Sequence, residues 1–370
     1  MKRIVSIDIV RGIVMMLMAI DHVRVYAAIP PGGPSPGVFF TRWITHFVAP
    51  AFIFLAGTSA YLHGQKLGNM AELSKFLAVR GAILIALELT LIRIFWTFNF
   101  DFGNYILAGV IWVIGWCMIL LAVAVHLPVR VVGAIGIGLI TLHNLMDFVP
   151  WPENPSWLLK VLYYGGGIGP LKILYVIVPW LGVMLAGYAF GRVITMEPDR
   201  RRTTVLRLGL AVTAAFLVLR AVDRYGDPRH WRPDPGVLQF LATTKYPASL
   251  AFLLMTLGPM LIVLALVDRW RGRVADGIST FGRVPMFYYL LHIPVIHLAA
   301  CIVSLVREGR VVPWLFGNHP LMPGHPAAGY MWSLGLLYLV TAATLIALYF
   351  PCRWYARVRA ERRSAWTSYL

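Results

Sequence analysis

An arginine and a histidine share one face of the first apolar segment. Arg11 and His22 are eleven positions apart, so on an α-helix they lie about 20° apart around the axis and about 16 Å apart along it. Asp8 lies about 40° from His22 on the same stripe. The pKa of histidine lies near neutrality, and arginine is suited to binding phosphate. The stripe predicts an anion site and a general base on one helix. The alternative is a structural Asp8–Arg11 ion pair and a histidine bonded to backbone.

Other ionisable residues in apolar segments are candidates to assist this base. Asp21 projects about 100° from His22 and is expected to reach a neighbouring helix. Glu88 lies mid-segment, where a carboxylate must be paired or protonated. Either carboxylate is a candidate to orient the imidazole, as the Asp of a catalytic triad does. His46 comes level with His22 if the first two segments form a hairpin. Arg93 lies about 140° off the face of Glu88, so each is expected to pair with a different helix.

The ninth apolar segment carries Tyr288 and His292 at i and i+4, on one helix face. His297 is about 140° from His292, so the two cannot ligate one metal ion from a regular helix. The three cysteines have no paired spacing. We therefore expect neither a metal nor a haem. Acyl transfer also needs donors for an oxyanion, for which His46, Tyr288 and Lys245 are candidates.

The elements that must position these groups are transmembrane helices. Of the 370 residues, 59% are hydrophobic and only 13% are charged, which excludes a soluble enzyme and a disordered chain. We predict one all-α transmembrane domain over residues 1–370, ending in a short basic cytoplasmic tail at 353–370. Spans of about 20 residues are expected at ten places. They are 4–27, 43–63, 76–97, 105–126, 129–147, 171–194, 203–222, 246–267, 284–305 and 328–352.

The excess of basic residues predicts the orientation. The net charge is +17; with ten spans, the loops and ends carry +14 on the side of both termini and +4 on the other, and charged residues within the spans contribute the remaining −1. The positive-inside rule then places both termini in the cytoplasm, so the charge does not indicate nucleic-acid binding. We expect a multi-pass protein of a bacterial cytoplasmic (inner) membrane.

Short motifs resemble those of the transmembrane acyltransferase superfamily, which includes the acyltransferase-3 proteins. Most favour its heparan-α-glucosaminide N-acetyltransferase-like branch. The motifs are Asp8-x-x-Arg11-Gly12 with Asp21-His22, Arg42-Trp43-Ile44-Thr45-His46-Phe47-x-x-Pro50 with Phe54-Leu55-Ala56-Gly57-Thr58-Ser59, Pro179-Trp180-Leu181-Gly182 with Gly187-Tyr188-x-Phe190-Gly191, Lys245-Tyr246-Pro247-x-Ser249-Leu250, and Phe281-Gly282-Arg283 through His297.

The resemblance implies a membrane enzyme that takes acyl-CoA from the cytoplasm and acylates a sugar amine or hydroxyl at the other face. By this resemblance, His22 matches the catalytic histidine of the acyltransferase-3 proteins, and Arg11 matches the arginine that lies near CoA in them. We expect catalytic roles for His22, Asp21, Glu88 and His46, CoA contacts from Arg11, Arg283 and Asp8, with Arg200–Arg202 as further candidates, and acceptor contacts from Arg42, Lys245, Tyr288 and His292.

The predicted function is therefore transfer of an acetyl group from acetyl-CoA to a sugar or glycolipid, with His22 as base or transient acyl acceptor. The alternative is a secondary transporter whose buried polar groups line a path for a small polar or lipid-linked substrate. The expected partners are the lipid bilayer, acyl-CoA and the acceptor. The acceptor's identity, N- or O-acylation and the oligomeric state stay open.

Overall fold

Apolar segments bounded by capping residues account for most of the structure. The computed structural model describes residues 3–32, 35–232 and 236–361. The Asn69 side chain accepts hydrogen bonds from two N–H groups of the first turn of α4 (Met70–Leu87). Ser249 does the same with one N–H of α12 (Leu250–Leu266). Such caps satisfy N–H groups that have no partner within the helix, so they fix where the helices begin.

The chain divides into two compact units, and each is described by itself. Unit 1 comprises Met1–Ser6, Ala49–Leu89 and Ile106–Arg269, and unit 2 comprises Ile7–Val48, Thr90–Tyr105 and Trp270–Leu370. Apart from α4 and α12, the helices of unit 1 are α3 (Val48–Leu67), α6 (Val110–Ala124), α7 (Val129–Leu142), η3 (His143–Phe148), α8 (Trp157–Leu159), η4 (Lys160–Tyr164), α9 (Ile177–Ile194), α10 (Pro198–Val222), α11 (Val237–Leu241) and η5 (Val267–Arg269).

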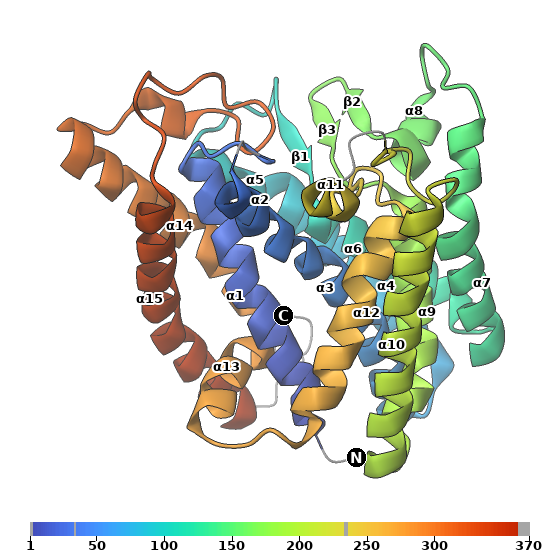
Figure 1. Cartoon of the computed structure of the whole chain (residues 1–370). Coiled ribbons are helices and arrows are strands. Elements are labelled where there is room, and N and C mark those ends of the chain that lie inside the picture. The colour runs from blue at the N-terminus through green and yellow to red at the C-terminus, as the bar shows by residue number, and fades with distance from the viewer. Residues whose placement is uncertain (1–2, 33–34, 233–235, 362–370) are drawn as a thin grey trace. The chain divides into compact units, whose positions relative to one another are not determined.

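Unit 1 is built from closely packed helix pairs, α4 with α6, α7 with α9, and α10 with α12 (Figure 1). A Cβ on Gly81 of α4 would lie 2.5 Å from the carbonyl oxygen of Gly115 in α6. The two backbones therefore touch, as in the small-residue contacts typical of membrane helices. Because glycine alone leaves room at such a crossing, its position in the sequence sets where the pair meets.

A small sheet in unit 1 shortens two of the predicted spans. Strand β1 (Ile106–Ala108) pairs in parallel with β3 (Leu171–Ile173), and β2 (Gly166–Ile168) pairs antiparallel with β3. The spans expected from 105 and 171 therefore begin later, as α6 and α9. Backbone groups that a helix would satisfy internally are satisfied here by the strand ladder.

Unit 2 contains α1 (Val5–Tyr26), α2 (Pro36–Trp43), η1 (Ile44–Phe47), α5 (Arg93–Thr97), α13 (Arg273–Arg283), α14 (Pro285–Glu308), η6 (Pro313–Phe316) and α15 (Leu334–Glu361). Helices α13 and α14 both contact α15. Helix α15 runs into the predicted basic tail at 353–370, of which residues 362–370 lie outside the described residues.

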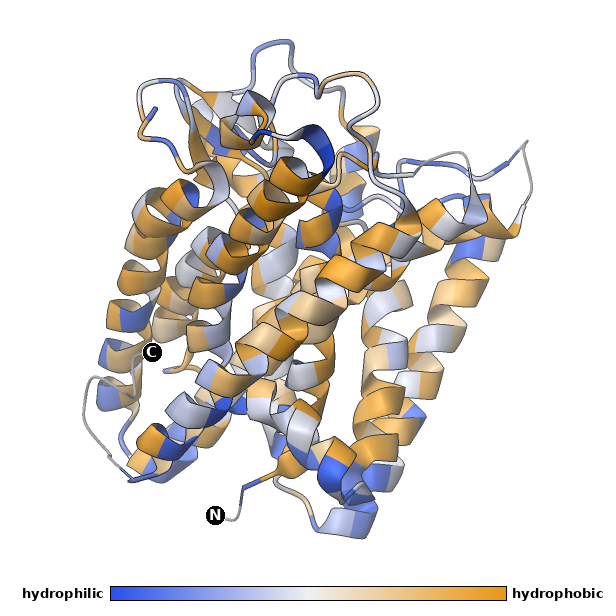
Figure 2. Ribbon diagram, turned by 90° about the vertical axis from the view of Figure 1, so that its left-hand side faces the viewer, coloured by the Kyte–Doolittle hydropathy of each residue, from blue (hydrophilic) through white to orange (hydrophobic). Residues whose placement is uncertain are grey.

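The protein is an all-α polytopic membrane protein apart from the three short strands. Each of the ten predicted spans overlaps a helix, and Figure 2 shows hydrophobic residues along the helices with hydrophilic ones gathered toward their ends. Within the described ranges, seven helices are long and apolar enough to cross a membrane. They are Pro36–Leu67, Val129–Phe148, Ile177–Ile194, Pro198–Val222, Leu250–Arg269, Pro285–Glu308 and Leu334–Glu361. Helix α1 is 22 residues long but carries four charged residues.

Candidate functional site

Helix α1 of unit 2 meets α13 at a crossing of two glycines. A Cβ on Gly282 would collide with the carbonyl oxygen of Asp8, and a Cβ on Gly12 would collide with a carbonyl oxygen of α13. The backbones are therefore in contact. The neighbours of these glycines, Arg11 on α1 and Arg283 on α13, lie at the same junction.

Arginines from three helices gather at this junction. The Arg359 guanidinium of α15 donates to the carbonyl oxygen of Arg283 at 3.2 Å. The Nε of Arg283 is buried and has no hydrogen-bond partner within the part of the chain that the structure describes. Arg11 is partly buried and Asp8 is buried. The structure thus brings Arg11 and Arg283, both predicted to contact CoA, to one junction, and it adds Arg359, which was expected only as part of the tail.

At the other end of α1, two predicted site residues meet. The Nδ1 of His22 lies 2.7 Å from the Nε2 of His292 on α14, and the rings are stacked with centroids 4.8 Å apart. His292 is fully buried, while His22 is only partly buried. The pair joins residues 270 positions apart in the sequence.

The second bond of His292 fixes the protonation of the pair. Its Nδ1 lies 2.6 Å from the carbonyl oxygen of Tyr289, which carries no hydrogen, so Nδ1 must donate. In neutral His292, Nε2 then holds the lone pair and accepts the hydrogen from Nδ1 of His22. In neutral His22, the lone pair is then on Nε2, the atom at which this imidazole would act as a base or nucleophile.

Aromatic rings hold the pair in place. Trp96 packs edge-on against His22 with centroids 4.7 Å apart, and Tyr288 stacks on His292 at 5.2 Å. The shared face predicted for Tyr288 and His292 is confirmed. The Tyr288 hydroxyl donates to the carbonyl oxygen of Met15 at 3.0 Å, which ties α14 to α1.

Asp21 reaches a neighbouring helix, as predicted, but its partners are arginines. Both carboxylate oxygens lie 2.7 Å from Nη1 of Arg42 on α2, and Oδ1 also accepts from Nε of Arg24 at 3.1 Å. The Nδ1 of His22 therefore faces a second imidazole in place of the expected carboxylate. His46 lies partly buried in η1 of the same unit.

Glu88, in unit 1, lies at the start of α6. Its Oε2 accepts from the N–H of Ile111 at 3.1 Å, and it is fully buried. A carboxylate at a helix N-terminus complements the helix dipole. The predicted pairing of Glu88 with another helix is confirmed. The prediction that Arg93 pairs with another helix is wrong, because its Nε donates to the main-chain oxygen of Tyr105 at 2.9 Å. The π-helical turn η2 (Glu88–Ile92) also removes the regular helical spacing that was assumed between Glu88 and Arg93.

Lys245, also in unit 1, lies against two tyrosine rings. Its Nζ is 5.2 Å from the ring centroid of Tyr246 and 5.8 Å from that of Tyr175, and the side chain is buried. Aromatic faces stabilise such a cation. Lys245, Glu88 and the further CoA candidates Arg200–Arg202 thus belong to unit 1, whereas the other predicted site residues belong to unit 2.

Hydrogen bonds join two loops of unit 2. The Tyr105 hydroxyl donates to the carbonyl oxygen of His319 at 2.9 Å, and Asn318 donates to Asp101 at 3.3 Å. Bonds from Asn318 and Asn104 lower the pKa of Asp101. Burial lowers the pKa of His319 to about 4, so this histidine is neutral near pH 7.

Sequence reasoning missed Arg24, Trp96 and Arg359. The i, i+3 spacing of Asp21 and Arg24 is a signal that could have found the first. Nothing local marks the other two, because each reaches its partner from a distant segment. Among residues 3–32, 35–232 and 236–361, no three His, Cys, Asp or Glu side chains are arranged to hold a metal ion.

A family model described as heparan-alpha-glucosaminide N-acetyltransferase, catalytic, matches residues 3–221, which is more than half of the chain. No curated protein matches the chain. The matched range includes Arg11, His22 and Glu88 and ends in α10. His292 and Arg283 lie beyond it, so their place beside α1 comes from the structure.

Proposed function

The chain belongs to the heparan-α-glucosaminide N-acetyltransferase-like family and is a membrane acetyltransferase, and we propose that it moves an acetyl group from cytoplasmic acetyl-CoA to a sugar amine or hydroxyl across the bilayer. The acceptor is a sugar or glycolipid. The membrane is the bacterial cytoplasmic membrane, with both termini on its cytoplasmic side, as the division of basic residues favours.

The hydrogen bond from His22 to His292 is the observation that carries this proposal. In one route, Nε2 of His22 takes the proton of the acceptor as its oxygen or nitrogen attacks the thioester carbonyl. The C–S bond then breaks and the proton passes to the thiolate, giving CoA. In the other route, Nε2 attacks the carbonyl itself, the C–S bond breaks and the CoA thiolate leaves; the acceptor then attacks the acyl-imidazole, Nε2 is released, and the proton that the acceptor loses balances the one taken up by the thiolate.

His292 supports either route as a positioning residue. When His22 becomes positively charged, its Nδ1–H bond to the neutral imidazole strengthens, because a charged donor makes a stronger hydrogen bond. His292 and Tyr288 were expected to touch the acceptor. Since their polar atoms are used by His22, Tyr289 and Met15, we assign both to holding His22.

The binding sites for the acyl donor and the acceptor are assigned to the two ends of α1. We assign the CoA phosphates to Arg11 and Arg283, with Asp8 beside them; an extended pantetheine arm covers the roughly 16 Å from Arg11 to His22. We assign Arg42 to the acceptor, because it is bonded to Asp21, the residue next to His22 in the sequence. Asp21 thus acts through Arg42, and His46 and Lys245 stay candidates for contacts with the acceptor.

The test uses vesicles that contain the full chain, loaded with a panel of amino sugars and glycolipids. Labelled acetyl-CoA added to the cytoplasmic face should be consumed, and the label should appear on the enclosed acceptor. Movement of an acceptor without acetyl-CoA would instead support a transporter. His22→Ala should lower transfer at least about 100-fold. His325→Gln, an exposed histidine of the same unit, is the matched control and should leave transfer unchanged.

A further inference from the structure

Two lysines of unit 1 converge on one glycine of the hairpin formed by β2 and β3. The Nζ of Lys160 in η4 donates to the carbonyl oxygen of Gly167 at 2.9 Å. The Nζ of Lys172 in β3 lies 3.4 Å from where a Cβ on Gly167 would be, and it donates to the carbonyl oxygen of Gly169 at 3.0 Å. Both ammonium groups therefore lie beside Gly167, which is exposed at one end of the unit (Figure 1).

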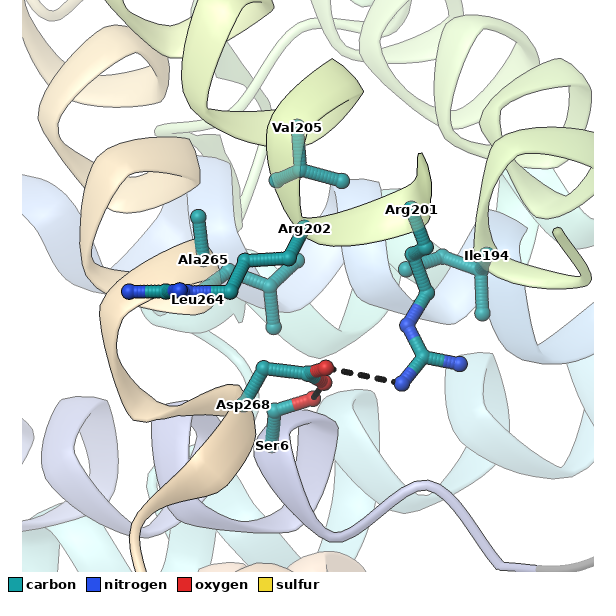
Figure 3. Close-up of a pocket in the computed structure, with 8 residues that line it drawn as sticks. All are labelled: Ser6, Ile194, Arg201, Arg202, Val205, Leu264, Ala265 and Asp268. Atoms are coloured by element: carbon teal, nitrogen blue, oxygen red, sulfur yellow. Dashed lines mark hydrogen bonds and ion pairs between the residues drawn. The ribbon is translucent and has the colours of Figure 1, made fainter. Parts of the chain in front are cut away.

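Neither ammonium group is neutralised by a described residue. The two lysines form no ion pair within the described ranges, and the hydrogen bonds that they make there end on main-chain oxygens. Two positive charges at one residue repel each other, and an anion between them would replace this repulsion with attraction. Two arginines of α10 differ in both respects, because Arg201 donates to Asp268 at 2.8 Å and its side chain points away from that of Arg202 (Figure 3).

The main chain at Gly167 adds a third donor. The turn of the hairpin has two residues, so the pair that flanks it, Ile168 and Leu171, is the hydrogen-bonded one. The next pair, Gly167 and Lys172, is then not hydrogen-bonded. Because β2 lies at the edge of the sheet, the N–H of Gly167 points out of the sheet, as does the carbonyl oxygen that Lys160 contacts. Sheet edges with such outward donors can form anion sites.

The fold does not require a glycine at position 167. The φ angle of Gly167 lies outside the left-handed region, unlike those of Gly166 and Gly169, which are 93° and 55°. Among the described residues beyond its two chain neighbours, only Lys172 comes within 4 Å of an added Cβ. A side chain here would therefore meet the lysine alone and would cover its ammonium group. The glycine leaves the main chain and both lysines open to a ligand, which is one use of glycine in proteins.

We propose that this hairpin binds a phosphate monoester, with Lys160, Lys172 and the N–H of Gly167 as its donors. A phosphate monoester carries about −1.5 to −2 charges at pH 7, which matches two ammonium groups better than a carboxylate does. Lysine binds phosphate as a point charge, so the site needs no planar fork of donors. The proposal goes beyond acetyl transfer and does not depend on it, since the three residues belong to unit 1 and the histidine pair to unit 2.

The test is isothermal titration calorimetry on the full-length protein in phosphatidylcholine nanodiscs. Glucose 6-phosphate and inorganic phosphate are titrated in separate runs, and glucuronate is the singly charged control. We expect saturable binding of glucose 6-phosphate, weakened about tenfold in Lys160→Gln and in Lys172→Gln, because each loses a charge-assisted hydrogen bond. Lys75→Gln removes an exposed lysine of α4 in the same unit and should bind as the wild type does. Inorganic phosphate should follow the same pattern; a higher affinity of the sugar phosphate would show that the sugar adds contacts.

Gly167→Val tests the geometry with both lysines in place. A β-branched residue suits a strand, so the hairpin should still fold, which circular dichroism checks. The new side chain should cover the ammonium group of Lys172 and weaken binding at least about tenfold. Phosphate binding that is unchanged in both lysine variants would place the phosphate elsewhere and overturn the proposal. Glucuronate binding as tightly as glucose 6-phosphate would overturn the match to a doubly charged group.

Discussion

The two units bury charged and polar groups in different ways. In unit 1, Glu88 accepts from a main-chain N–H, and the buried Arg220 donates to several main-chain oxygens. In unit 2, the buried His292 bonds a side chain, that of His22. Other buried groups of unit 2, such as Arg93 and His297, bind main-chain oxygens as well, so the contact between two imidazoles is what sets the His22–His292 pair apart from them. Main-chain partners cannot exchange protons at neutral pH, so they suit structure, whereas two imidazoles can pass a proton between them.

Breaking the histidine pair should have the largest effect. His292→Phe keeps an aromatic ring beside Tyr288 but removes the acceptor of the His22 hydrogen, so we expect kcat to fall about 100-fold. The pH–rate profile should move as well, because the group that stabilises charged His22 is gone. His292→Gln supplies an amide oxygen and should recover part of the rate. A wild-type rate and profile in His292→Phe would remove His292 from the mechanism.

Matched glycine substitutions compare the two units directly. Gly282→Ala in unit 2 and Gly115→Ala in unit 1 each force a methyl group into a helix crossing, and each should lower stability by about 1–3 kcal/mol. Only Gly282→Ala should also lower the activity of the folded fraction, by roughly tenfold, because it shifts α1. Thermal unfolding and kcat/KM are measured on both. Equal activity losses would mean that unit 1 contributes to the chemistry too.

Glu88 tests whether unit 1 serves only as scaffold. Glu88→Ala should destabilise the protein by about 1–3 kcal/mol, since an N–H of α6 loses its partner. Activity per folded molecule should stay within about twofold of the wild type. A stable but inactive Glu88→Gln would return this carboxylate to the catalytic role that the sequence suggested.

An effect on stability alone, seen only when the pH is lowered, concerns the loops of unit 2. The pKa of His319 is lowered to about 4 in the folded chain, against about 6.5 when unfolded. The unfolded state therefore binds more protons between these values, so stability is complete above pH 6.5 and declines as the pH falls toward 4. The loss is at most about 3 kcal/mol. Unfolding measured against pH should show this decline in the wild type and a weaker one in His319→Asn.

Several features of the site could be predicted from the sequence because they depend on local geometry. The face shared by Tyr288 and His292 follows from i, i+4 spacing, and the structure has their rings stacked. The same reasoning failed for Arg93, because a π-helical turn breaks the regular period ahead of it. The orienting partner of His22 was expected to be a carboxylate; Asp21 is instead held by two arginines.

By itself, the sequence determined the membrane class, the approximate positions of the long apolar helices and the face of α1 that carries Arg11 and His22. Helix periodicity and hydrophobicity act over a few residues, so they can be taken from the chain directly. Only the tertiary structure decided that His22 bonds His292. That choice depends on how closely α1 approaches a segment 270 residues away, which a contact such as Gly12 against α13 sets and no local pattern encodes.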